Sequence, residues 1–115
     1  MRLSQVQDLL DATVVSDIAW QDIEVTSAFG CDLMSDVLAF VKDQSVLLTG
    51  LINPQVIRTA EMLDIKVIIF VRGKTPTEEM IELSKKLNIV LMCTKLPLYI
   101  SSGKLYSAGL AGNGA

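Results

Sequence analysis

The chain has 115 residues, of which 50% are hydrophobic and 20% charged, and its formal net charge is -3. This length suffices for one hydrophobic core, so we expect residues 1–115 to form a single domain. No apolar run approaches the ~20 residues that a membrane-spanning helix needs. The pI of about 4.8 argues against nucleic-acid binding, because proteins of that class usually have a basic face. The first residues do not resemble a signal peptide. We therefore expect a cytoplasmic protein with no nucleic-acid and no membrane partner.

The N-terminal segment predicts one helix and two short strands. Leu3, Val6 and Leu10 recur at helical spacing, and Ser4 is the expected N-cap. Two later segments are rich in β-forming residues and predict strands, namely residues 13–15 and 22–26.

A second helix is predicted after a loop over residues 27–32. Asp32 or Ser35 can cap it, and it is expected to run to about residue 41. Its apolar residues fall on one face, which should be the buried one: Leu33, Val37, Leu38 and Val41.

The rest of the chain repeats one pattern three times. A short apolar run, over residues 45–50, 67–71 and 88–92, is followed each time by a turn and a proline that opens a helix. The three prolines, Pro54, Pro76 and Pro97, lie 22 and 21 residues apart, and proline is favoured at the first helical position. Strand–helix–strand passages of this size give a parallel sheet covered by helices.

Local sequence also predicts how these helices begin and end. Asn53 and Thr75 are the expected N-caps, and Thr75 with Glu78 completes a capping box. In the last helix, residues 101–103 (Ser-Ser-Gly) are expected to interrupt or bend the helix. The small-residue tail, residues 109–115, is expected to be flexible.

The parallel strands predict a ligand site at their carboxyl ends, where loops and helix N-termini meet. Helix N-termini, hydroxyl groups and three cations at this edge suit a phosphate or carboxylate group. The same residues also serve as caps and turns, and no Gly-x-Gly-x-x-Gly or P-loop motif accompanies them. The candidate ligand-binding residues are Thr49, Gly50, Asn53, Arg72, Gly73, Lys74, Thr75, Thr94 and Lys95.

The composition argues against several kinds of active site. The chain has no histidine, which excludes a Ser-His or Cys-His catalytic pair within it. The two cysteines, Cys31 and Cys93, lack the spacing of a zinc or redox motif. We therefore expect no catalytic residue, no metal site and no cofactor.

Four segments of the chain resemble a known family in their order and spacing. They are residues 30–35 (Gly-Cys-Asp-Leu-Met-Ser), 46–50 (Val-Leu-Leu-Thr-Gly), 72–76 (Arg-Gly-Lys-Thr-Pro) and 92–99 (Met-Cys-Thr-Lys-Leu-Pro-Leu-Tyr). Together, from about residue 23 to residue 106, they resemble the DRTGG domain family, which is related to the N-terminal domain of HPr kinase/phosphorylase. Related regulatory inserts occur in CBS-domain pyrophosphatases and phosphotransacetylases. The Asp-Arg-Thr-Gly-Gly motif itself is replaced here by Thr49-Gly50 followed by Leu-Ile-Asn-Pro.

The resemblance implies a three-layer α/β/α domain with a mainly parallel central sheet, similar to the N-terminal domains of MurF and HPr kinase. It also implies a homodimer with a regulatory role beside catalytic domains. Two functions follow. The first is a non-catalytic regulatory or ligand-sensing module that binds a small anionic metabolite or nucleotide, or docks a partner protein. The alternative is a small enzyme domain in which Arg72, Lys74 and Lys95 clamp a phosphorylated or acyl-phosphate substrate.

Overall fold

The computed structural model describes residues 1–41 and 45–113, which form a layered α/β domain around one sheet. Within these residues the sheet has six strands, in the order β1-β5-β4-β3-β2-β6. The four central strands are parallel, β6 is parallel to β2, and β1 is antiparallel to β5. The strands are β1 (Thr13–Val14), β2 (Ser27–Gly30), β3 (Ser45–Thr49), β4 (Val67–Phe70), β5 (Val90–Cys93) and β6 (Ala111–Gly112).

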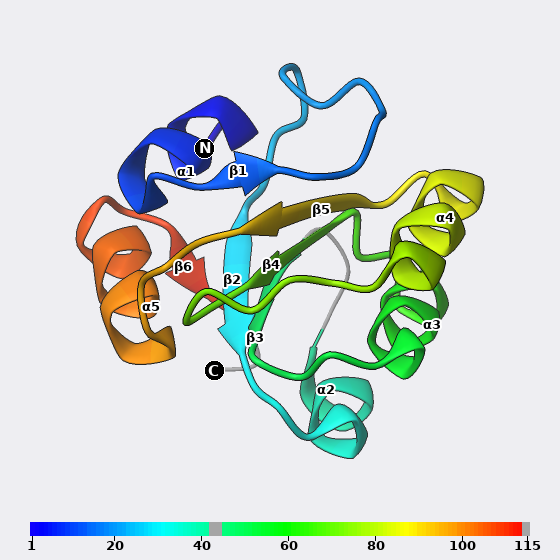
Figure 1. Cartoon of the computed structure of the whole chain (residues 1–115). Helices are drawn as coiled ribbons and strands as arrows, with labels where there is room; N and C mark the ends of the chain where they lie inside the picture. Colours follow the sequence, from blue (N-terminus) through cyan, green and yellow to red (C-terminus); the bar gives the residue numbers. More distant parts are fainter. Residues whose placement is uncertain (42–44, 114–115) are drawn as a thin grey trace.

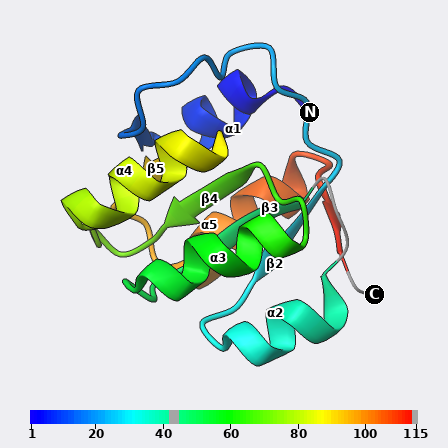
Figure 2. The same ribbon diagram turned by 90° about the vertical axis from the view of Figure 1, so that its right-hand side faces the viewer.

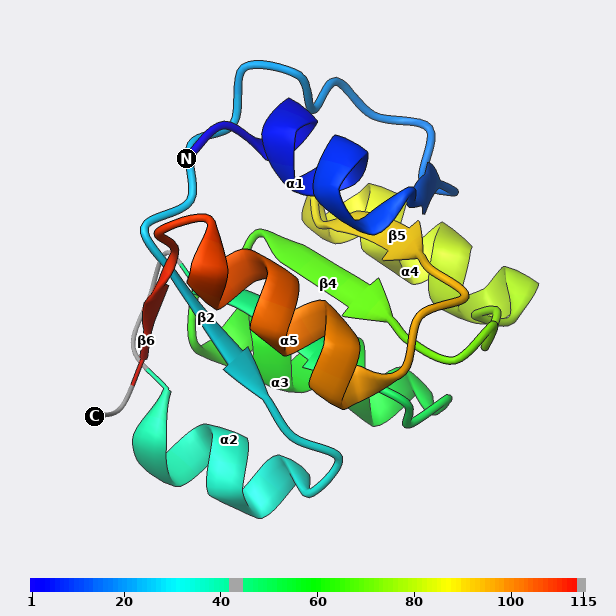
Figure 3. The same ribbon diagram turned by 90° about the vertical axis from the view of Figure 1, so that its left-hand side faces the viewer.

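Helices cover both faces of the sheet (Figure 1). The first group is α2 (Met34–Phe40), α3 (Pro54–Met62) and α4 (Glu78–Leu87), and the second is α1 (Leu3–Leu10) and α5 (Leu98–Ser107). The first group lies in front of the sheet in Figure 2, and the second lies in front of it in Figure 3. The predicted fold class, three-layer α/β/α with a mainly parallel sheet, is therefore confirmed. None of the helices in residues 1–41 and 45–113 is long and apolar enough to span a membrane.

The sheet has a hydrophobic core on each face, so its central strands are buried throughout. Every residue of β3 and β4 is buried. Successive side chains point to opposite faces, so Val67 and Ile69 pack beneath α1 and α5. Ile68 and Phe70 pack beneath α2, α3 and α4. This confirms the predicted strands buried between two helical layers.

The helix starts agree only in part with the prediction. Asn53 caps α3 as expected, since its side chain accepts a hydrogen bond from the Gln55 amide, and Pro54 is the first helical residue. The expected Thr75 cap is wrong, because α4 begins at Glu78 and the Thr77 hydroxyl accepts from the Met80 amide at 3.2 Å.

The other two prolines therefore do not hold the expected first helical position. Pro76 lies just before the Thr77 cap, and Pro97 is itself the N-cap residue of α5.

The N-terminal third differs most from expectation. Ser4 does not cap α1, because the N-cap residue is Arg2, whose amide donates to the Gln5 side chain. The predicted strand over residues 22–26 is wrong, since only an isolated bridge joins Arg2 to Glu24 there. The predicted loop after it forms β2 instead, because β3 and β6 supply hydrogen-bonding partners on its two sides.

The buried face of α2 agrees in part with the prediction. Neither Asp32 nor Ser35 caps this helix, whose N-cap residue is Leu33. Val37 and Val41 are buried as expected, and so is Met34. Leu33 and Leu38 are instead 57% and 41% exposed.

At the C-terminal end, one expectation is corrected. The helix α5 runs without interruption through residues 101–103, and the Ser101 hydroxyl donates to the Leu96 carbonyl oxygen. The tail is paired where the structure describes it, because Leu110 is buried and β6 pairs with β2. The Asn113 side chain donates to the hydroxyls of Ser27 and Ser45. Residues 114–115 lie outside the described part of the chain.

Candidate functional site

The chain changes face at the end of β5. The helices α2, α3 and α4, which precede β5, lie on one face of the sheet, and α5, which follows it, lies on the other (Figures 2 and 3). The loops after β4 and β5 therefore leave the sheet in opposite directions. Such a reversal at the carboxyl ends of parallel strands is the usual place for a ligand in an open α/β sheet.

The loop after β4 begins with a tight turn over residues 71–74. Arg72 and Gly73 both have positive φ, of 58° and 72°, and the Lys74 amide donates to the Val71 carbonyl oxygen at 3.2 Å, as in a type I′ turn. Across the turn, the Arg72 amide donates to Leu96 and the Gly73 amide to Thr94, both at 2.9 Å. These backbone donors are therefore used within the protein and do not face a ligand.

A buried threonine, Thr94, fixes the start of the loop after β5. Thr94 is 3% exposed, and its hydroxyl donates to the Leu10 carbonyl oxygen at 2.7 Å. The same hydroxyl accepts from the Leu96 amide at 3.2 Å. The end of α1 is thereby fastened to the end of β5.

A cavity of about 410 Å³ lies at this place, and we call it the switch-point cavity. Three segments distant in sequence form its walls: the end of α1 with β1, the loop after β4, and the loop after β5. Its lining residues are Leu10, Asp11, Thr13, Gly73, Thr75, Cys93, Thr94, Lys95 and Leu96. Four of the predicted site residues are among them: Gly73, Thr75, Thr94 and Lys95.

The other predicted residues lie elsewhere. The Asp32 carboxylate accepts from the Thr49 hydroxyl at 2.9 Å and from the Gly50 amide at 2.7 Å. A carboxylate of the protein itself thus occupies the position where an external anion was expected. Asn53 caps α3, and Arg72 and Lys74 are exposed outside the lining of the cavity.

The helix N-terminus predicted beside the second loop also offers little to an anion. The first turn of α4 contains Glu78 and Glu79, whose carboxylates already complement the positive end of the helix. A site in the switch-point cavity would instead depend on side chains, above all on Lys95.

Sequence reasoning missed five lining residues. Cys93 and Leu96 flank the predicted Thr94-Lys95 pair, so adjacency could have found them. Asp11 and Thr13 are brought to the cavity by the pairing of β1 with β5, for which the local sequence holds no signal.

Burial raises the pKa of the Cys93 thiol, because desolvation disfavours the thiolate. The pKa of this thiol is therefore higher in the folded than in the unfolded protein, so its protonated form favours folding. This contribution to the free energy of unfolding is complete below the ordinary thiol pKa. It is lost as the pH rises through the folded value.

In a Cys31→Ser variant, we expect the remaining thiol to react with iodoacetamide only at a more alkaline pH than free cysteine does. A rate profile that matches free cysteine would contradict this assignment.

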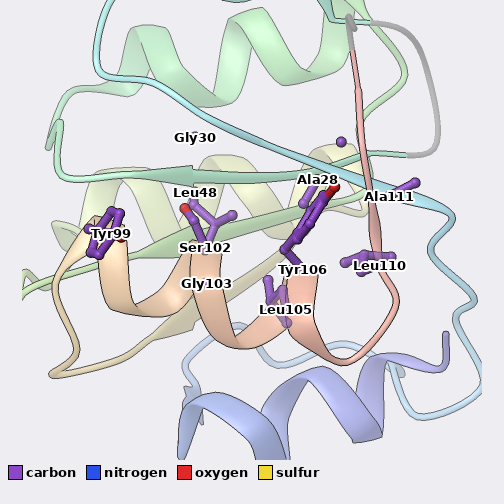
Figure 4. A pocket seen from close by; sticks show the side chains of 11 residues that line it. Ala28, Gly30, Leu48, Tyr99, Ser102, Gly103, Leu105, Tyr106, Leu110 and Ala111 are labelled. Atoms are coloured by element: carbon purple, nitrogen blue, oxygen red, sulfur yellow. The ribbon is translucent and has the colours of Figure 1, made fainter.

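A second cavity, of about 330 Å³, lies between α5 and the sheet and contains none of the predicted residues (Figure 4). Its floor includes Ala28 and Leu48, and Tyr99 and Tyr106 of α5 stand at its rim. Gly30 lets α5 approach β2 closely, since a Cβ atom there would lie 3.1 Å from the Leu98 side chain. None of the described residues that line this cavity is charged, so they offer an anion no cation.

No known family model and no curated protein sequence matches the chain. Among solved structures, it is similar to the CBS and DRTGG domains of the regulatory region of Clostridium perfringens pyrophosphatase, a structure complexed with the activator diadenosine tetraphosphate. The TM-score is 0.74 at 20% sequence identity, and the match covers 90% of this chain and 45% of that chain. The chain thus spans less than half of that regulatory region. The likeness supports the fold, and the fold alone.

Proposed function

We propose that this chain is a non-catalytic regulatory domain of the DRTGG type that senses a small anionic metabolite or nucleotide in the switch-point cavity. The observation that carries the proposal is the position of this cavity, between the loops where the chain changes face. Ligands of open α/β sheets bind at such points. The similarity to a regulatory region whose activator is a nucleotide supports a sensing role.

The chemistry of the cavity suits an anion of modest size. Its volume of about 410 Å³ lies within the ~300–1,000 Å³ of small-molecule sites. Lys95 supplies an exposed ammonium group, and Thr75 an exposed hydroxyl. Arg72 and Lys74, on the neighbouring turn, add positive charge to the approach.

The alternative, an enzyme acting on a phosphorylated or acyl-phosphate substrate, has less support. Of the three cations expected to clamp the substrate, Lys95 alone lines the cavity among the described residues. Within the described part of the chain, Asp11 is the single carboxylate in the lining. The raised pKa of Cys93 makes its thiol a weak nucleophile at neutral pH.

We also propose that the protein is a cytoplasmic homodimer, and docking of a partner protein is the alternative to binding a small ligand. Exposed aromatic side chains on α5 support an association surface, since Tyr99 is 84% exposed and Tyr106 is 73% exposed. Light scattering at tens of micromolar tests the dimer, and a monomer at that concentration would contradict it.

Thermal shift tests the ligand. The panel comprises inorganic phosphate, acetyl phosphate, AMP, ATP and diadenosine tetraphosphate. A compound that binds the folded state at 100 times its Kd adds about 2.7 kcal/mol of stability, which should raise Tm by several degrees. Lys95→Ala should abolish this rise. Lys66→Ala is the matched control, because it removes the same charge just before β4, at the opposite end of that strand.

A second readout locates the site. In the Cys31→Ser background, a bound compound should slow the alkylation of Cys93, which lines the cavity. No Tm rise with any compound would overturn the sensing proposal. A rise that survives Lys95→Ala and leaves Cys93 unprotected would place the ligand elsewhere.

A further inference from the structure

We infer that Asp11 determines the specificity of the switch-point cavity: the ligand presents a hydrogen-bond donor, an ammonium or hydroxyl group, to Asp11 while its anionic group meets Lys95. This inference rests on the proposed function and adds a second chemical requirement to it. The donor can belong to the ribose of a nucleotide or to an amino group, and the experiment below separates these two sources.

Strand pairing brings the two charged residues to the same cavity. In the antiparallel pair of β1 and β5, Thr13 lies opposite Cys93 and Val14 opposite Met92. Asp11 precedes Thr13 by two residues and Lys95 follows Cys93 by two residues, so both lie beyond the same end of this ladder. Both residues line the cavity.

The backbone on both sides is held in place. The hydrogen bond from the Thr94 hydroxyl to the Leu10 carbonyl oxygen joins the two residues that immediately precede Lys95 and Asp11. Asp11 ends α1 in the left-handed conformation, with φ of 47°, and its amide donates to the Asp8 carbonyl oxygen. Each charge therefore projects from a fixed position at the same junction.

The two charges do not neutralise each other. Among the ion pairs formed by residues 1–41 and 45–113, none joins Asp11 to Lys95. The cavity thus presents a cation and an anion, and a purely anionic ligand would meet repulsion from Asp11. A ligand that carries both an anionic group and a hydrogen-bond donor can pair with Lys95 and with Asp11. The resulting difference in affinity between such a ligand and a purely anionic one gives selectivity.

Asp11→Gly is the sharpest variant, because it removes the carboxylate and glycine accepts a positive φ without strain. Asp64→Gly is the matched control: Asp64 is also exposed, with φ of 56°, but it lies before β4, at the other end of the sheet. Both variants lose one negative charge. The melting temperatures of the two variants without ligand show whether either change disturbs the fold.

Isothermal titration of the wild type and both variants uses two pairs of probes. AMP is compared with 2′,3′-dideoxy-AMP, which lacks the ribose hydroxyls, and O-phosphoserine with its deaminated analogue. For the donor-bearing probe that binds, Asp11→Gly should weaken affinity about 10-fold, equivalent to 1.4 kcal/mol. The partner that lacks the ribose hydroxyls or the α-amino group should bind weakly to the wild type and more tightly to Asp11→Gly, which removes the repulsion from the carboxylate.

The outcomes separate the two proposals. Selectivity in the AMP pair assigns the donor to a ribose, and selectivity in the phosphoserine pair assigns it to an amino group. Equal affinities within both pairs, or equal effects of Asp11→Gly and Asp64→Gly, overturn the role of Asp11 while binding that depends on Lys95 still supports the sensing function. If no probe binds the wild type, the sensing proposal fails at this site, and the role of Asp11 with it.

Discussion

Phe70→Ala should lower the free energy of unfolding by about 3–5 kcal/mol, the usual effect of deleting a buried aromatic ring. Phe70 is the last residue of β4 and is fully buried beneath α2, α3 and α4. A loss of this size is a large part of the ~5–15 kcal/mol that holds a typical domain folded. Urea unfolding followed by circular dichroism measures it.

Phe40→Ala is the control for this prediction. The same side chain is removed, but Phe40, at the end of α2, is 57% exposed. We expect a change within about 0.5 kcal/mol. Equal losses for the two variants would contradict the placement of β4 at the centre of the core.

Thr94→Val should cost about 2 kcal/mol, because it leaves the Leu10 carbonyl oxygen and the Leu96 amide without their hydrogen bonds. Valine has nearly the same shape as threonine, so the loss reports the hydroxyl group and not packing. Thr94→Ser keeps the hydroxyl and should retain most of the stability. Urea unfolding of the three proteins makes the comparison.

The same substitution also tests the architecture of the candidate site. Freed from Thr94, the end of α1 should hold Asp11 less firmly against the cavity. Amide hydrogen exchange should therefore rise near the end of α1 in Thr94→Val and not in Thr94→Ser. Unchanged exchange in both variants would show that the hydroxyl does not fasten the helix.

The parallel core was predictable because its signals are local. Each central strand is a short apolar run that fills both faces, and the Asn53-Pro54 pair marks the start of α3 within a few residues of sequence. Such patterns depend on burial and capping, which neighbouring residues determine.

The errors arose where distant partners decide the structure. The segment Ser27–Gly30 contains few β-forming residues, yet it becomes a strand because β3 and β6 lie on its two sides. Thr77 replaces Thr75 as the cap because the turn after β4 is fixed to the loop after β5 before α4 begins.

The candidate site likewise combines local features, which the sequence predicts, with contacts between distant residues, which it does not. Loops at the carboxyl ends of the strands could be located from the sequence, and with them Thr94 and Lys95. The hydrogen bonds from Thr49 and Gly50 to Asp32 could not, since they join residues 17 and 18 positions apart across two elements. Asp11 reaches the cavity through two contacts between distant residues, the pairing of β1 with β5 and the hydrogen bond from Thr94 to Leu10.

The spatial order of the strands also bears on how the protein forms. From β2 to β5, each strand lies beside the next one along the chain, so the parallel core grows through local crossovers. The outer strands close much longer loops: β1 must meet β5, and β6 must meet β2. Until these two-residue strands dock, both edges of an apolar sheet are open to pairing with other chains. The short terminal strands thus cover the edges of an apolar core, and we expect that variants which detach them aggregate more readily during refolding.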